Sequence, residues 1–228
     1  MAGGISYSEG LIQSLERSLR SAFNQPYLRL TRKPHRPGGG FYVFVEKGEK
    51  DAQTDDGREQ TVTAILSAEG QPTSFYFAFV TTFDIFTRGY ILQHASLIVF
   101  HDVYAGELTP LFRAEWDYVA ASDTTSKHAQ PHWHFVQRPE RIERIVRTII
   151  SPPLNFKVEE QGEIFGGLAD CGRIHFAMTS LGPLQKQVFQ SDNFRKWFES
   201  LTNYISEQIE YLISKAPAAA VRDFVADE

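Results

Sequence analysis

The chain of 228 residues contains a single cysteine, Cys171. One thiol excludes a disulfide within the chain and a zinc site built from several of its own cysteines. Such a composition is typical of a reducing compartment, so we expect a cytoplasmic protein. The first residues also lack a basic segment followed by an apolar run, which predicts that no signal peptide is present.

Long hydrophobic runs and an excess of basic residues are missing as well. The most apolar stretches, residues 74–83 and 91–100, are shorter than the roughly 20 residues that a helix needs to cross a bilayer, so we expect no membrane association. The formal net charge of −5 argues against a general nucleic-acid coat protein, since such proteins are usually basic. A local basic site stays compatible with this charge.

The chain does contain enough apolar material for a substantial core. Hydrophobic residues make up 42% of it, and the 18 Phe and 9 Tyr indicate strands rich in aromatic side chains. No Pro/Gly/Ser-rich linker divides the chain into comparable halves. We therefore expect one domain over residues 1–228, with residues 216–228 as a flexible tail.

The hydrophobic periodicity predicts a helix, then a series of strands, then helices near the C-terminus. Ser6 and Glu9 have the spacing of a capping box, which predicts that the first helix begins there and continues to about Asn24. The charged segment 47–60 is expected to be an exposed loop. We expect strands at 27–30, 41–45, 61–66, 74–80, 90–100, 110–117, 132–136, 155–160 and 173–177, and helices at 140–150 and within 184–216. This order predicts an α+β fold with a largely antiparallel sheet.

Three of the seven histidines, His128, His132 and His134, fall within seven residues. Residues two apart on a strand share a face, so His132 and His134 would point the same way. The strand predicted at 110–117 also alternates, with Glu115 and Asp117 on one face. If these two strands pair antiparallel, both carboxylates share a face with the two histidines, while Trp116 and Trp133 face the core.

Imidazoles and carboxylates on one surface are suited to a divalent metal such as zinc or manganese, and such a site supports hydrolysis by activating water. Two alternatives remain open: a metal-free site in which histidine acts as an acid, a base or an anion contact, and a purely structural cluster. The predicted metal ligands are His128, His132, His134 and Glu115, and the predicted catalytic residues are His132, His134, Asp117 and Arg173.

Basic residues follow the histidine segment. Arg173 alternates with His175 in a short predicted strand and would clamp a phosphate, although a surface arginine is an equally good interpretation. His94 and His101 occur in an apolar strand and are expected to be structural. The predicted helix after the histidines has an arginine at every third position, which favours phosphate binding or, because Glu140 and Glu143 partly neutralise it, a solvated face; these arginines are Arg138, Arg141, Arg144 and Arg147.

Three short motifs occur in a fixed order between residues 115 and 176. They are Glu115-Trp116-Asp117, His128-x-x-Pro131-His132-x-His134-Phe135 and Gly172-Arg173-Ile174-His175-Phe176. This order resembles a set of uncharacterised bacterial proteins that are often encoded beside toxin–antitoxin or phage-defence genes. The resemblance implies a toxin or antiviral-defence setting and a partner protein encoded nearby.

These observations favour a phosphodiester hydrolase acting on nucleic acid or a nucleotide, with the histidine cluster as a metal or acid–base site. The main alternative is a non-catalytic subunit or interaction module of a multiprotein defence complex, in which the histidine surface binds a partner. A third alternative is a protein that binds a small molecule without converting it.

Overall fold

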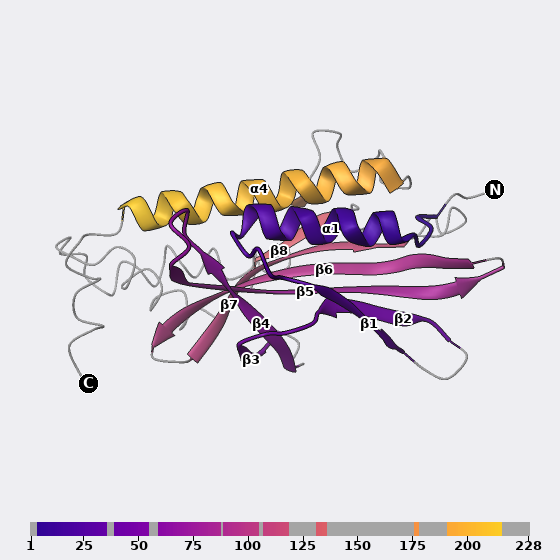
Figure 1. Cartoon of the computed structure of the whole chain (residues 1–228), viewed down its shortest axis with the longest axis horizontal. Coiled ribbons are helices and arrows are strands. Elements are labelled where there is room, and N and C mark those ends of the chain that lie inside the picture. The colour runs from indigo at the N-terminus through magenta and orange to yellow at the C-terminus, as the bar shows by residue number, and fades with distance from the viewer. Residues whose placement is uncertain are drawn as a thin grey trace.

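A computed structural model describes residues 4–35, 39–54, 59–87, 89–104, 107–118, 131–135, 176–177 and 191–215. Within these ranges, helices α1 (Glu9–Ala22) and α4 (Ser191–Lys215) lie side by side over one face of a nine-stranded sheet (Figure 1). Every strand pairing that the structure describes is antiparallel. The predicted α+β class with a largely antiparallel sheet is confirmed.

Helix α1 begins two residues later than the sequence predicts. Its N-cap is Ser8, whose hydroxyl oxygen accepts a hydrogen bond from the Leu11 backbone N–H at 3.1 Å. The expected cap, Ser6, instead forms an isolated antiparallel bridge with Ile91, so it lies beside the sheet and does not cap the helix. The helix ends at Ala22, and the positive φ of 52° at Asn24 turns the chain away from the helix axis.

The sheet branches at one long central strand, β5 (Pro72–Phe86). Its main order is β1-β2-β5-β6-β7-β8-β9, while β4 pairs with both β3 and β5. Because β6 occupies one edge of β5, β2 and β4 share the other edge, where β4 pairs with residues 72–77 and β2 with residues 80–83. The strands are β1 (Leu30–Pro34), β2 (Phe41–Val45), β3 (Lys50–Gln53), β4 (Glu59–Leu66), β5 (Pro72–Phe86), β6 (Gly89–Tyr104), β7 (Glu107–Asp117), β8 (His132–Phe135) and β9 (Phe176–Ala177).

Two local predictions were wrong. The charged segment 47–60 contains strand β3, in which Ala52 is buried while Lys50 forms an ion pair with Asp102. The sequence pattern did not indicate this strand, because only one of its four side chains is buried and two of the others are charged. The short strand expected at 27–30 lies at Leu30–Pro34 instead, and Pro34 is tolerated there because β1 is an edge strand.

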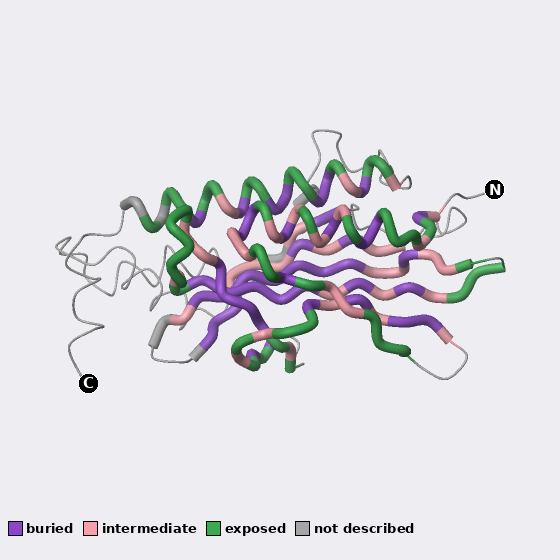
Figure 2. The backbone as a smooth tube through the Cα atoms, in the orientation of Figure 1, coloured by how far each residue is buried: buried purple, intermediate pink, exposed green. Residues whose placement is uncertain are grey.

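The two faces of the sheet carry different cores. On the helix side, large side chains such as Phe77, Val99 and Trp116 pack against α1 and α4. On the other side, a smaller cluster that includes Tyr76 and Ile98 lies under the β3–β4 hairpin. Figure 2 shows the buried residues concentrated in the strands beneath the helices.

Several predicted elements fall on residues that the structure does not describe: the helix at 140–150, the strand at 155–160, residues 184–190 and the tail at 216–228. Residues 191–215 form one continuous helix. Of the strand predicted at 173–177, only Phe176–Ala177 is described, as β9. Neither of the two described helices is long and apolar enough to cross a membrane.

Candidate functional site

Strands β7 and β8 pair antiparallel, which is the condition that the predicted site requires. Glu115 lies directly opposite His132, and Arg113 lies opposite His134. Opposed residues of an antiparallel pair share a face of the sheet. Trp116 is buried in the core on the helix side, so its neighbours Glu115 and Asp117 lie on the face away from the helices.

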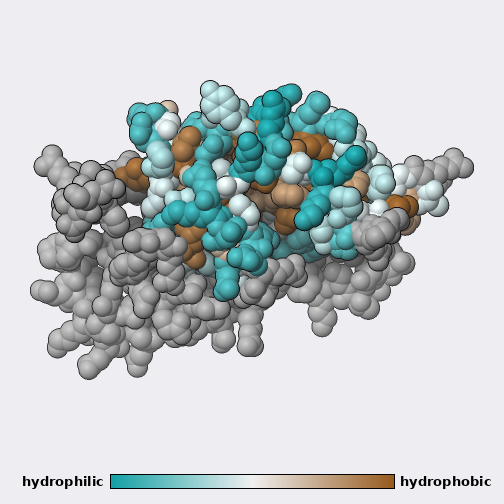
Figure 3. Space-filling model, turned by 60° about the horizontal axis from the view of Figure 1, so that its bottom comes forward, coloured by the Kyte–Doolittle hydropathy of each residue, from teal (hydrophilic) through white to brown (hydrophobic). Residues whose placement is uncertain are grey.

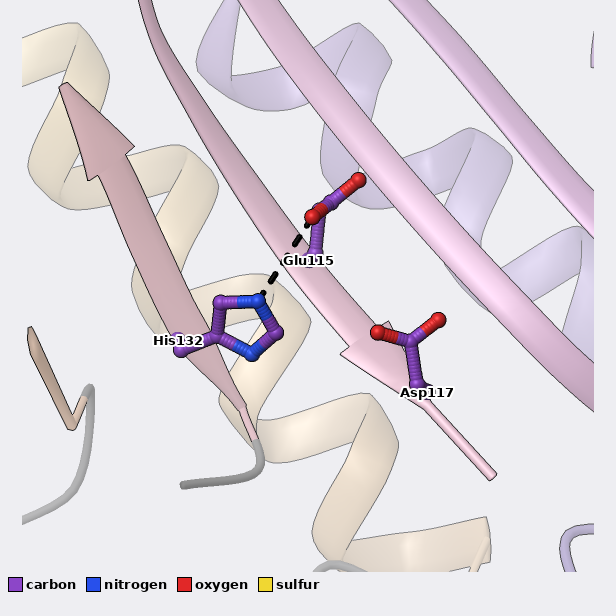
Figure 4. Close-up of side chains that lie close together, drawn as sticks. All are labelled: Glu115, Asp117 and His132. Atoms are coloured by element: carbon purple, nitrogen blue, oxygen red, sulfur yellow. Dashed lines mark ion pairs between the residues drawn. The ribbon is translucent and has the colours of Figure 1, made fainter. Parts of the chain in front are cut away.

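Glu115, Asp117 and His132 bring one ligand-type atom each to within 4.8 Å of one another (Figure 4). His132 Nε2 lies 3.5 Å from Glu115 Oε2. Zinc with bonds of about 2.1 Å in a tetrahedral site would place its ligand atoms about 3.4 Å apart. The three ligand-type atoms would have to approach one another by up to about 1.4 Å, and with that approach the group could hold a metal ion.

His94 on β6 joins this group from the opposite side of β7. Its backbone lies opposite Asp117 in the β6–β7 pairing, and its Nδ1 lies 2.7 Å from Asp117 Oδ1. An ionised carboxylate only accepts hydrogen bonds, so Nδ1–H is the donor. His94 Nε2 is also 3.8 Å from Glu115 Oε1. Sequence reasoning missed this residue, because its proximity depends on the register between two long strands and leaves no local signal.

Arg113 holds the other carboxylate. Its Nε lies 3.1 Å from Glu115 Oε1, and both side chains are about one-seventh exposed. The His132 side chain is 4% exposed, whereas that of Asp117 is 42% exposed. A largely buried carboxylate needs cationic or hydrogen-bonding partners, and Arg113, His94 and His132 surround Glu115. The same contacts would also occur in a purely structural cluster. A measurement of metal binding therefore distinguishes a metal site from a structural cluster.

The remaining predicted site residues are not placed. For His134 the structure describes only the backbone, within β8. The predicted ligand His128, the predicted clamp Arg173 and the four arginines of the predicted phosphate-binding helix lie outside the described residues: Arg138, Arg141, Arg144 and Arg147. Their roles stay predictions.

A cavity of about 370 Å³ adjoins the cluster on the same face of the sheet. Of the three ligand-type residues only Glu115 lines it, together with His94 and Arg113, which contact the carboxylates of that group. Strands β1, β2, β5 and β6 supply most of the rest of its lining, and the β3–β4 hairpin contributes Thr54 and residues 59–61. Pockets of this size, about 300–1,000 Å³, are typical of small-molecule sites.

Comparisons of the chain with protein-family models, with curated proteins and with solved structures found no match. The geometry therefore defines the site by itself, as a histidine–carboxylate cluster at the edge of a cavity.

Proposed function

We propose that this protein is a metal-dependent hydrolase of phosphodiesters, in which Glu115, Asp117 and His132 hold a divalent zinc or manganese ion. The observation that carries the proposal is the convergence of their three ligand-type atoms within 4.8 Å beside a cavity. Two carboxylates favour manganese and the imidazole favours zinc, so both ions suit the donor set. Three protein ligands leave coordination positions open for water and substrate.

The residues around the ligands have supporting roles in this proposal. A bound ion of this kind supplies a water molecule whose pKa is low enough for it to act as a nucleophile near neutral pH. His94 donates a hydrogen bond to Asp117 and limits the orientations of that carboxylate, and Arg113 forms an ion pair with Glu115. Such outer partners tune a metal site by orienting its ligands.

The substrate proposed is a phosphodiester of a nucleic acid or a nucleotide. Arg113 lines the cavity next to Glu115 and offers a guanidinium group to an anion there. Lys33 adds a second cation to the cavity lining. Arg173 and the predicted arginine helix would add phosphate contacts outside the described residues.

The test is the metal content of protein purified without a histidine tag and dialysed against manganese or zinc. We expect close to one ion per chain in the wild type and loss of that ion in Glu115→Gln and in His132→Ala. Glu46→Gln is the matched control, because Glu46 is exposed and lies outside the cluster. The metal-loaded wild type should hydrolyse bis(4-nitrophenyl) phosphate, and the two site variants should not.

Two results would contradict this proposal. A wild type that binds neither ion, and whose melting temperature is unchanged by either, rules out the metal site. A wild type that binds the ion but hydrolyses no phosphodiester rules out the hydrolase.

A further inference from the structure

A cavity lies beside the proposed metal ligands Glu115, Asp117 and His132, and its ligand is not specified by the proposed hydrolase activity. On the face shown in Figure 3, hydrophilic side chains surround small, separate hydrophobic areas.

We propose that the cavity is the substrate pocket and that it takes a small phosphorylated molecule of nucleotide size rather than a nucleic-acid strand. The phosphate group of this molecule binds after the divalent ion. This inference rests on the proposed metal site, because the ion supplies the charge that attracts the phosphate.

The sheet register leads from the cavity to the metal cluster. Lys33, Tyr42, Thr82, His94 and Asp117 are successive partners across β1, β2, β5, β6 and β7. All but Asp117 line the cavity. Neighbouring strands lie about 4.8 Å apart, so Lys33 and His94 are separated by about 14 Å across three strand spacings. A single molecule of nucleotide size can therefore lie between the lysine and the cluster.

A second row of cross-strand partners gives the cavity its apolar part. Phe44, Val80 and Ser96 lie in register on β2, β5 and β6, and the row continues to Glu115 and His132. Phe44 and Val80 provide an apolar surface for a planar ring. Thr82 and Ser96 add hydroxyl groups to the lining, and Ser96 is the β6 residue between Val80 and Glu115 in this row. This mixture of an apolar wall and a few polar groups is typical of small-molecule pockets.

The β3–β4 hairpin limits the size of the ligand. It lines the cavity through residues such as Thr54 and Thr61, and Lys50 ties it to β6 by an ion pair with Asp102 at 2.9 Å. The cavity volume of about 370 Å³ is at the small end of the range for ligand pockets. The cavity therefore has room for one molecule of nucleotide size, and further nucleotides of a strand would lie outside it.

The charges around the cavity explain the order of binding. Lys33 and Arg113 cancel Glu59 and Glu115 among the lining residues, and the adjacent Asp117 leaves a net charge of −1. A divalent ion changes this net charge to +1, so the pocket attracts an anion only when it is loaded. Because binding free energies are reciprocal, the anion must also strengthen metal binding by the same factor.

The test is calorimetric titration of the full chain with adenosine 5′-monophosphate, with and without manganese, and with a ten-nucleotide DNA strand. We expect the nucleotide to bind at least tenfold more tightly when manganese is present, and more tightly than the strand. Val80→Trp should abolish nucleotide binding but retain manganese, because it fills the cavity floor two strands away from Glu115. Ile85→Trp on the same strand is the control, because Ile85 is 54% exposed.

A second pair of variants tests the far end of the pocket and does not depend on the folding of Val80→Trp. Lys33→Gln should weaken nucleotide binding several-fold, whereas Lys47→Gln, at an exposed lysine outside the cavity, should not. Manganese binding without nucleotide binding would overturn the pocket and leave the metal site standing. Tighter binding of the strand, or nucleotide affinity that is independent of manganese, would also overturn the inference. Failure to bind manganese would instead overturn the proposed function on which it rests.

Discussion

His94 and Asp117 lie opposite each other on β6 and β7, and His94 Nδ1 lies 2.7 Å from Asp117 Oδ1. The two residues are 23 positions apart in the chain, and the long β6–β7 pairing brings them together. Asp117 is the most exposed member of the proposed metal group, so this hydrogen bond limits the orientations open to its carboxylate. We therefore assign His94 as a positioning residue of the site.

Removing this hydrogen bond should weaken metal binding. Loss of an outer hydrogen-bond partner typically costs 10–100-fold in metal affinity, so we expect His94→Ala to bind manganese roughly 10–100-fold more weakly, as measured by calorimetry. His94→Asn retains a side-chain N–H near the position of Nδ1 and should restore part of the affinity. Wild-type affinity in His94→Ala would show that the contact does not position Asp117.

Trp116 anchors α4 to the sheet on the side opposite the site. Its side chain is 1% exposed, and its ring meets Phe194 edge to face at 5.6 Å. Truncating a buried tryptophan typically costs about 3–5 kcal/mol, so we expect Trp116→Ala to lower the free energy of unfolding by this amount in urea. Tyr27→Ala is the control, because Tyr27 is 90% exposed and should change stability by no more than about 0.5 kcal/mol. Similar losses in both variants would contradict this role.

His101 should make the protein less stable in mild acid. Burial lowers the pKa of His101 below its usual 6.5, and the negative charge of Asp102 opposes this only in part. The unfolded chain therefore binds a proton at a higher pH than the folded chain. The contribution of neutral His101 to the free energy of unfolding is fully present above about pH 6.5, and it is lost as the pH falls toward the lowered pKa.

His101→Gln tests this pH dependence because it removes the titrating group and can still hydrogen-bond to Ser74, whose hydroxyl oxygen lies 3.1 Å from His101 Nε2. The measurement is the free energy of unfolding between pH 8 and pH 5. The wild type should lose more stability over this range than His101→Gln. Parallel pH profiles would show that other groups account for the acid sensitivity.

Gly40 allows β2 to approach β5 closely. A Cβ at this position would overlap the carbonyl oxygen of Phe83, which is the β5 partner of Phe41. We expect Gly40→Ala to destabilise the fold by about 1–3 kcal/mol, because the backbone of β5 must shift. The same substitution at Gly89 meets no atom within 4 Å and should be close to neutral in urea denaturation. Equal effects at the two glycines would disprove the steric explanation.

Elements with a clear hydrophobic period were predicted well from the sequence. The alternation in 110–117 and 132–136 is local, and it predicted which side chains of each strand share a face. That the two strands pair, and so bring Glu115 and Asp117 beside His132, is shown only by the structure. Strand β3 was missed because its charged side chains interact with distant groups, as Lys50 does with Asp102. The Ser8 cap was missed because Ser6 offers an equivalent hydroxyl, and only its bridge to Ile91 removes it from the helix.

The sequence by itself determined the α+β class, the stripe of α1 that packs on the sheet and the alternation of faces within β7 and within β8, because each depends on residues close together in the chain. Tertiary structure alone decided that His94 contacts Asp117, that Lys33 belongs to the same cross-strand row and that a cavity lies between them. These relationships depend on the register of long strands and on the branching of the sheet at β5. Register is set by the packing of whole faces against both cores, which no short segment of sequence encodes.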